Sequence, residues 1–228
     1  MMEKMPEVTK NLLIINVLMF VATFVLGRVG VNLGDIFALH FFKAADFAPY
    51  QLFTYMFMHG GLAHLFFNMF ALYMFGRTLE YVWGGKRFLV YYLVAGIGAG
   101  VLQECVQYMH YLQMGLDSYA MVRVSGSEIV PMGQFLNGWT TVGASGAVYA
   151  ILLGFGMSFP NERMFVFPLP FPIKAKIFVA VYAVIEFFLG MSGSNDGIAH
   201  FAHLGGMLFG LLLIIYWRKK HKIGGPYV

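Results

Sequence analysis

Six stretches of the chain are almost entirely apolar and long enough to cross a membrane as helices. A helix needs about 20 mostly apolar residues to span the hydrocarbon core, and fewer when its ends reach the interface. None of the six alternates apolar and polar positions as a transmembrane β-strand does. Because only helices and closed barrels satisfy their backbone in lipid, the pattern predicts an all-α membrane protein, a six-transmembrane helical bundle. The predicted spans are residues 11–27, 62–80, 87–107, 144–159, 174–191 and 198–217.

The fourth predicted span is shorter than a bilayer crossing requires. From Ser145 to Phe159 it has 15 residues, which is about 22 Å against a hydrocarbon core of about 30 Å. Its N-terminus should therefore stop below the outer surface, with the loop containing Gly143 just above it. Non-helical backbone at that depth is tolerated only where protein encloses it or where it lines a wet cavity. We therefore expect a short central helix that begins at Ser145 beneath such a cavity.

Composition and charge agree with a membrane protein and predict its orientation. The chain is 59% hydrophobic and 11% charged, with a mean hydropathy of +0.70, whereas a soluble domain carries about 25% charged residues. The net charge of +4 does not indicate nucleic-acid binding here, because 12 of the 15 Lys and Arg residues fall on the side of the two termini. The positive-inside rule then places both termini in the cytoplasm, with Ser145 toward the outer face. We expect a multi-pass protein of the bacterial inner membrane.

The domain organisation follows from the spans. We predict a short cytoplasmic N-terminus over residues 1–10, a membrane domain over residues 11–217, and a basic cytoplasmic tail over residues 218–228. The first apolar run lacks a small-x-small cleavage site, so we expect it to be retained as a helix. The connection over residues 28–61 is apolar and should lie partly in the outer interface, whereas the polar connection over residues 107–142 should be an external excursion.

Four polar residues lie near the ends of the three predicted spans that enter from the outside. His64 and Asn68 are four apart in the second span and therefore share one helical face. Ser145 opens the fourth span, and His203 lies about one and a half turns into the sixth. All four should share the outer half of the membrane. Polar residues inside a span usually face the bundle interior and mark function.

Packing alone could account for these residues. The sequence Gly143-Ala144-Ser145-Gly146 is typical of helices that approach closely, because small residues let the two backbones come together. His64 and Asn68 could make an ordinary hydrogen bond between helices. Tyr149 could be a simple core aromatic.

A metal site and a proton pathway are two further alternatives. Zinc is disfavoured because neither a His-Glu-x-x-His pattern nor a carboxylate cluster accompanies the histidines, and we expect no metal and no cofactor. A proton pathway needs acids along both leaflets, whereas the spans contain few beyond Glu104 and Glu186. Asp196, in the loop before the sixth span, is most simply solvated. The histidines considered as ligands are His59, His64, His200 and His203.

The same residues supply what nucleophilic catalysis requires. It needs a hydroxyl, a base that takes its proton, and donors where the oxyanion develops. Ser145, His203 and the His64/Asn68 pair provide one of each. The start of the fourth helix adds free backbone N–H groups and the positive end of the helix dipole. Tyr149, one turn below Ser145 on the same face, is placed to pack against an imidazole.

Taken in order, the motifs resemble the rhomboid family of intramembrane serine proteases, of the six-transmembrane core type. The resemblance covers residues 45–217. The matching motifs are Pro49-Tyr50-Gln51-Leu52-Phe53-Thr54, His59-Gly60-Gly61 followed by His64 and Asn68, Gly76-Arg77-Thr78-Leu79-Glu80, Gly143-Ala144-Ser145-Gly146 with Tyr149, and His203 with Gly206 and Gly210.

The resemblance implies a serine endopeptidase that uses a Ser-His dyad rather than a triad. Ser145 would be the nucleophile and His203 the general base. The side chains of His64 and Asn68, with the backbone N–H of Ser145, would form the oxyanion hole. The implied supporting residues are Tyr149, Gly143, Gly146, Gly206, Gly210, His200 and His59.

The resemblance also implies partners and leaves one alternative. The substrates would be transmembrane proteins cut near the outer face, in contact with the lipid bilayer, and the oligomeric state stays open. The alternative is an inactive rhomboid-like protein that binds membrane clients, although such relatives lack the serine or the histidine that this chain retains. The family's first external loop often carries a Trp-Arg pair, and this chain has no Trp between residues 28 and 60.

Overall fold

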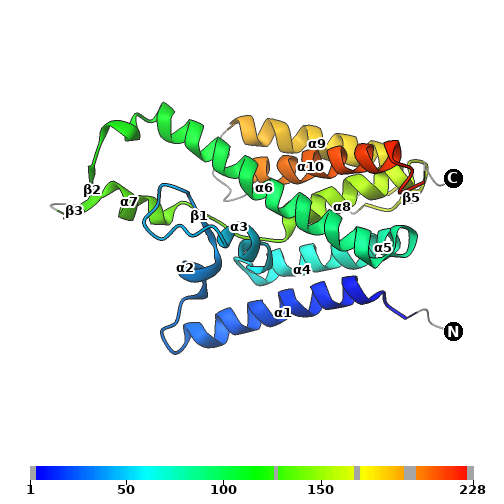
Figure 1. Ribbon diagram of the computed structural model, residues 1–228, viewed down its shortest axis with the longest axis horizontal. Helices are drawn as coiled ribbons and strands as arrows, with labels where there is room; N and C mark the ends of the chain where they lie inside the picture. The colour runs from blue at the N-terminus through cyan, green and yellow to red at the C-terminus, as the bar shows by residue number, and fades with distance from the viewer. Residues whose placement is uncertain (1–3, 126–127, 167–169, 193–198, 225–228) are drawn as a thin grey trace.

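The chain is an all-α membrane protein whose helices lie roughly side by side (Figure 1). The structure is a computed structural model that describes residues 4–125, 128–166, 170–192 and 199–224. The helices of the bundle are α1 (Glu7–Gly27), α4 (Leu62–Ala71), α5 (Arg77–Trp83), α6 (Gly85–Gln113), α8 (Ser145–Ser158), α9 (Ala175–Ser192) and α10 (His200–Lys219). A π-helical turn, η2 (Leu72–Gly76), joins α4 to α5 without leaving the helical region, so these two form one span.

The predicted spans agree closely with these helices. Helices α1, α6, α9 and α10 are long and apolar enough to cross a membrane, while α8 is shorter. The largest difference is at the end of α6, which continues to Gln113 instead of ending at residue 107. It continues because Tyr111 packs into an apolar cluster formed by the connecting loops. Helix α10 likewise includes Arg218 and Lys219, the first two residues of the predicted tail.

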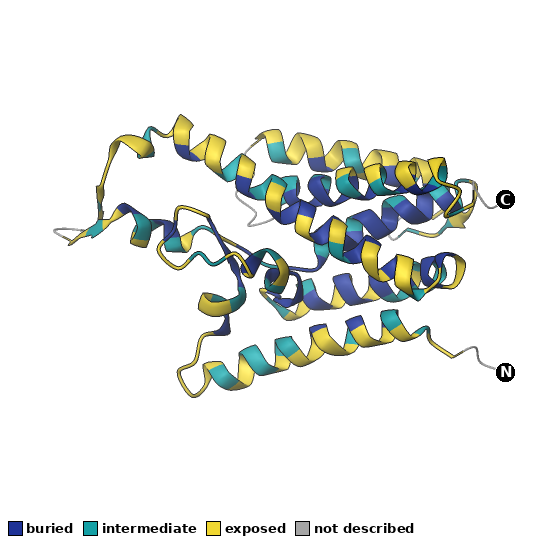
Figure 2. Cartoon of the chain, in the orientation of Figure 1, coloured by how far each residue is buried: buried dark blue, intermediate teal, exposed yellow. Residues whose placement is uncertain are grey.

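Helix α8 is the innermost helix, packed against α6 and α10. Figure 2 shows α8 mostly buried and α10 partly buried, whereas α1 and α9 expose most of their outer surfaces. The closest approach is between α8 and α10, where a Cβ added to Gly206 would lie 1.8 Å from the carbonyl oxygen of Gly146. A Cβ on Gly146 would meet Ala99 of α6 at 2.4 Å. Small residues therefore let three helices meet at one level, directly below Ser145.

Helix α1 is attached to the bundle by a carboxylate from another helix. Its N-cap residue, Pro6, provides no side-chain cap. Instead, Glu80 of α5 accepts hydrogen bonds from the backbone N–H groups of Val8 and Thr9 at 2.9 and 2.7 Å, and from the Thr9 hydroxyl at 2.7 Å. A helix N-terminus favours a negative charge, so Glu80 caps α1 across the tertiary interface.

The two long connections fold against each other and form a second core. The first contains α2 (Leu33–Phe37), β1 (Leu39–His40), α3 (Gln51–Thr54) and η1 (Tyr55–Phe57). The second contains η3 (Leu116–Ser118), the antiparallel hairpin β2 (Met121–Ser125) and β3 (Glu128–Pro131), α7 (Met132–Phe135), η4 (Leu136–Gly138) and β4 (Thr140–Thr141). Strand β1 pairs with β4, which places Leu39 opposite Thr141. The shared apolar cluster consists of Phe41, Ala44, Tyr111, Met132 and Leu136, with Trp139 packed on it.

The second connection, predicted as a polar external excursion, therefore packs against the first connection instead of standing alone. Gln51 is buried and holds the first connection together: its Nε2 donates to the carbonyl of Asp46 at 2.9 Å, and its Oε1 accepts from the N–H groups of His40 and Ala48 at 3.2 Å each. The first connection has no Trp, but Trp139 from the second connection packs against Phe41 with ring centroids 5.5 Å apart and planes inclined by 37°.

Both ends of the described chain lie at the same end of the bundle (Figure 1), as an even number of spans predicts. We call this the terminal end, and the opposite end, with the two long connections, the loop end. At the terminal end a short pair of strands, β5 (Arg163–Met164) and β6 (Ile173–Lys174), joins α8 to α9. Arg218 donates from Nη2 to the carbonyl of Met157 at 2.8 Å, which ties the end of α10 to the end of α8.

Candidate active site

Ser145 and His203 are in direct contact at the start of α8. The distance from Nε2 of His203 to Oγ of Ser145 is 2.8 Å. Ser145 is the first residue of α8, and His203 lies in the first turns of α10, where it is 6% exposed. The tight crossing at Gly146 and Gly206 fixes the separation of the two helices one residue after Ser145. A hydroxyl that donates to an imidazole in this way can transfer its proton to Nε2.

The imidazole of His203 is restrained from two further directions. The ring of Tyr149 stacks on it, with centroids 4.1 Å apart and planes inclined by 8°. Its Nδ1 contacts Oε2 of Glu186 on α9 at 2.9 Å. Since Nδ1 faces a carboxylate, it carries the proton, which leaves the lone pair of Nε2 free for Ser145.

Glu186 is the residue that the sequence interpretation did not place in the site. It is 5% exposed on α9, and three side chains donate to its carboxylate. His200 contacts Oε2 through Nδ1 at 2.7 Å, His203 contacts the same oxygen, and the Tyr149 hydroxyl donates to Oε1. The available signal was an isolated acid within an apolar span, which indicates an inward-facing functional position. The sequence alone did not show which helix it faces.

His64 lies on the other side of Ser145. A Cβ built on Gly143 would lie 2.8 Å from Nε2 of His64 and 3.5 Å from Oγ of Ser145, so both side chains surround the space next to Gly143. The N–H of Gly60 contacts Nδ1 of His64 at 3.4 Å. That contact favours a proton on Nε2, the nitrogen nearer Ser145. His64 therefore presents a donor beside the nucleophile.

Gly143 has the backbone that this arrangement requires. Its φ is +131°, a backbone conformation that residues other than glycine rarely adopt. Its N–H donates to the carbonyl of Tyr55 at 3.0 Å. It turns the chain from β4 into α8 and leaves room for the His64 ring.

The remaining predicted residues lie farther from Ser145 or have other contacts. Asn68 shares the helix with His64, but its Nδ2 donates to the carbonyl of His64 at 2.9 Å. His59 is buried and packs edge-on against His64, with centroids 5.1 Å apart. Gly210 lies one turn beyond Gly206, where a Cβ would meet Tyr91 and Ala150. Asp196 lies outside the described residues.

Among the residues that the structure describes, one cluster has the composition of a metal site. The ligand atoms of Glu186, His200 and His203 lie within 4.8 Å of one another. The contacts from His200 and His203 to the carboxylate are 2.7 and 2.9 Å, which match charge-assisted hydrogen bonds. Donors around a tetrahedral zinc ion at about 2.0–2.1 Å are about 3.3 Å apart. The cluster therefore fits protons between its atoms better than a metal.

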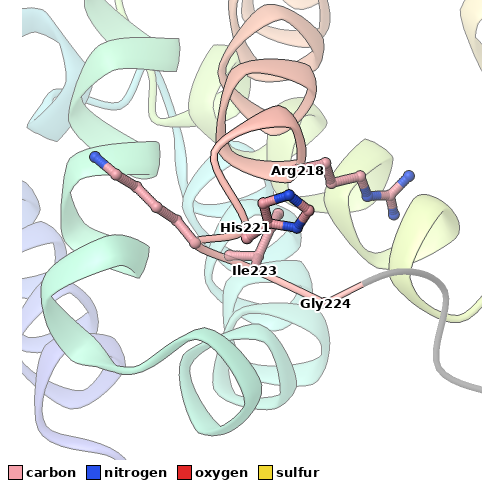
Figure 3. Close-up of a pocket in the computed structure, with 5 residues that line it drawn as sticks. Arg218, His221, Ile223 and Gly224 are labelled. Carbon is pink, nitrogen blue, oxygen red and sulfur yellow. The ribbon is translucent and has the colours of Figure 1, made fainter.

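A pocket at the terminal end is not part of this site. Figure 3 shows its lining at the end of α10, where Arg218, His221, Lys222, Ile223 and Gly224 come together. Fifteen positions of α10 separate His203 from Arg218, about 22 Å along the helix. The basic residues here belong to the basic tail predicted over residues 218–228.

Comparison with known proteins identifies the family. RHOMBOID-like protein 4 of Arabidopsis thaliana is 27% identical over 72% of this chain and 33% of its own length. Rhomboid protease AarA of Providencia stuartii is 27% identical over 74% of this chain and 56% of its own length. Rhomboid-like protein 16, chloroplastic, of Arabidopsis thaliana is 26% identical over 93% of this chain and 62% of its own length.

This chain thus spans between a third and about three fifths of the length of these curated relatives. The family model described as "Rhomboid domain" matches residues 46–220, which include every residue of the candidate site. The chain belongs to the rhomboid family.

Proposed function

We propose that this protein is an intramembrane serine endopeptidase that hydrolyses peptide bonds in or near the transmembrane segments of membrane proteins. The observation that carries the proposal is the 2.8 Å contact between Nε2 of His203 and Oγ of Ser145. Family membership and the similarity to a relative named as a protease support it. The inactive client-binding alternative is less well supported, because such a protein has no need for a paired nucleophile and base.

The reaction would proceed in two halves. Ser145 attacks the scissile carbonyl while His203 takes the hydroxyl proton, and the resulting imidazolium then protonates the leaving amine. Water, activated by the same imidazole, hydrolyses the acyl-enzyme. The site lies at the loop end of the bundle, where α8 begins, so the scissile bond would be near that face of the membrane.

The oxyanion would form between α8 and α4. The backbone N–H of Ser145 is among the first of α8 and has no partner within the helix. Nε2 of His64 would supply a second donor from across Gly143. Asn68 already donates one N–H to the carbonyl of His64, and its second N–H would be the third donor. Removal of one donor of this kind typically lowers the rate about 10²- to 10³-fold.

Labelling by a fluorophosphonate tests the proposal without knowledge of the substrate. The detergent-solubilised wild type should be labelled covalently, Ser145→Ala should not be labelled at all, and His203→Ala should react at least about 10³-fold more slowly. Ser192→Ala is the matched control, since this exposed serine at the end of α9 donates to the carbonyl of Leu189 in its own helix. It should label like wild type.

Two results would contradict the proposal. Equal labelling of wild type and Ser145→Ala would remove Ser145 as the nucleophile. A folded wild type that resists labelling would instead favour the inactive, client-binding alternative.

A further inference from the structure

Glu186 accepts more side-chain hydrogen bonds than helix packing requires. It is a carboxylate in the middle of an apolar helix, and burial of an ionised group is costly unless it is paired and hydrogen-bonded. Its neighbours Phe187 and Phe188 are exposed on the outer side of α9. Both of its oxygens are used: Oε2 accepts from His200 and His203, and Oε1 accepts from Tyr149.

These contacts all converge on the catalytic base. Tyr149 stacks on the ring of His203 and also donates to Glu186, so one residue restrains both the imidazole and the carboxylate. His200 is three positions before His203 on α10 and donates to the same oxygen. The carboxylate is therefore held in place by two side chains other than His203 itself.

We propose that Glu186 is a positioning residue for His203, so that the site works as a Ser145-His203-Glu186 triad instead of a dyad. This inference rests on the proposed function. Glu186 accepts the Nδ1 proton of His203 as a hydrogen bond, which fixes the tautomer with a free lone pair on Nε2. When Ser145 transfers its proton to Nε2, the imidazolium forms beside an ionised carboxylate. The carboxylate remains ionised throughout, and the same Nε2 proton later leaves with the amine.

The chain offers a control with a similar chemical change elsewhere. Glu104 on α6 is also a buried glutamate, and its Oε2 accepts from the N–H of Phe42 at 2.7 Å. Glu104→Gln replaces a buried carboxyl group within a span by its amide, without touching His203. A role for Glu186 in helix packing alone would make the two glutamine variants behave alike.

The first test measures the second-order rate constant of fluorophosphonate labelling. Glu186→Gln should label about 10²- to 10⁴-fold more slowly than wild type, since the imidazole loses the partner that selects its tautomer. Glu186→Asp, which keeps the charge on a shorter side chain, should recover part of that loss. Glu104→Gln should label at the wild-type rate. A wild-type rate for Glu186→Gln, or an equal loss in Glu104→Gln, would overturn the proposal.

The second test measures the tautomer of the His203 ring, and its decisive result comes from the wild type and does not depend on activity. In protein labelled with ¹⁵N-histidine, the His203 ring, assigned by comparison with His203→Ala, should show a protonated Nδ1 and an unprotonated Nε2. The Glu186→Gln ring should shift toward the other tautomer. A wild-type ring protonated on Nε2 would overturn the proposal even if every Glu186 variant failed to fold.

The two proposals fail in different ways. Labelling that does not depend on Ser145 would reject the serine protease, and the triad with it. Labelling that needs Ser145 and His203 but is indifferent to Glu186 would reject only the triad.

Discussion

At the scale of single residues, Gly143 limits what the site can tolerate. It adopts a φ of +131°, and the His64 ring occupies the space where its side chain would be. The backbone turn into α8 and the position of the His64 ring beside Ser145 thus both depend on the absence of a Cβ at Gly143. A substitution here acts twice, through backbone strain and through displacement of His64.

Gly143→Ala should therefore lose activity more than stability. The new Cβ would be 2.8 Å from Cε1 and Nε2 of His64, and a shift of about 1 Å in a catalytic group can lower the rate about 10²-fold. We expect fluorophosphonate labelling to slow by at least about 10-fold, with a thermal unfolding transition still present. Gly115→Ala is the control, because Gly115 also has a positive φ, +66°, but nothing lies within 4 Å of its Cβ position. Equal labelling rates for both variants would argue against this role.

At the scale of helices, the bundle is held together by close approaches and by buried carboxylates that join one helix to the next. Gly206 brings α10 onto α8, and Glu80 brings α5 onto the start of α1. The first depends on the absence of a side chain, and the second on a charge at a helix terminus. Both act between helices that are distant in the sequence.

Gly206→Ala should separate α10 from α8. The obstacle is the carbonyl oxygen of Gly146, 1.8 Å from the added Cβ, and backbone cannot move aside as a flexible side chain can. We expect destabilisation of about 3 kcal/mol, at the upper end for overpacking. Thermal unfolding in detergent measures it, with Gly27→Ala as the control because its Cβ would meet nothing within 4 Å. An unchanged transition for Gly206→Ala would mean that the helices can part freely.

Glu80→Ala should loosen α1. The substitution leaves the N–H groups of Val8 and Thr9 without their acceptor, and loss of a helix cap with charged hydrogen bonds costs about 2 kcal/mol. The exposed Glu7, in the same first turn, is the control, and Glu7→Ala should change stability by less than about 0.5 kcal/mol. Thermal unfolding of the two variants should differ clearly; identical transitions would refute the cap.

At the scale of the whole molecule, the two ends of the bundle differ in chemistry. The terminal end carries both ends of the described chain and the basic residues of α10, whereas the loop end carries the site and the second apolar core. The distribution of Lys and Arg predicts that the terminal end faces the cytoplasm. The site would then open toward the opposite side.

Reporter fusions test this orientation. Alkaline phosphatase is active only outside the cytoplasm, so a fusion after Lys222 should be inactive in a bacterial host, and a green fluorescent protein at the same position should fluoresce. The same phosphatase inserted between Gly115 and Leu116, in the second long connection, should be active. Reversal of the two phosphatase results would overturn the predicted topology.

Much of the bundle could be predicted from the sequence, because bilayer thickness sets the length of an apolar run. The same reasoning gave the depth of Ser145 and His203, and the structure brings them together. That reasoning could not predict which residues contact Glu186, because the depth of a residue in the membrane does not show which neighbouring helix it faces. The pairing of β1 with β4 was also out of reach, because two-residue strands have no periodicity to detect. The cap from Glu80 joins residues more than seventy positions apart, which no local pattern reveals.

The contact between Glu186 and His203 also has a consequence for any movement of α9 away from the bundle. The two residues are on different helices, and α9 is the more exposed of the pair. If α9 moved outward, the Glu186 carboxylate would move away from His203 with it. Under the proposed role of Glu186, His203 would then lose the partner that selects its tautomer, so Ser145 would react only while α9 is packed against the rest of the bundle.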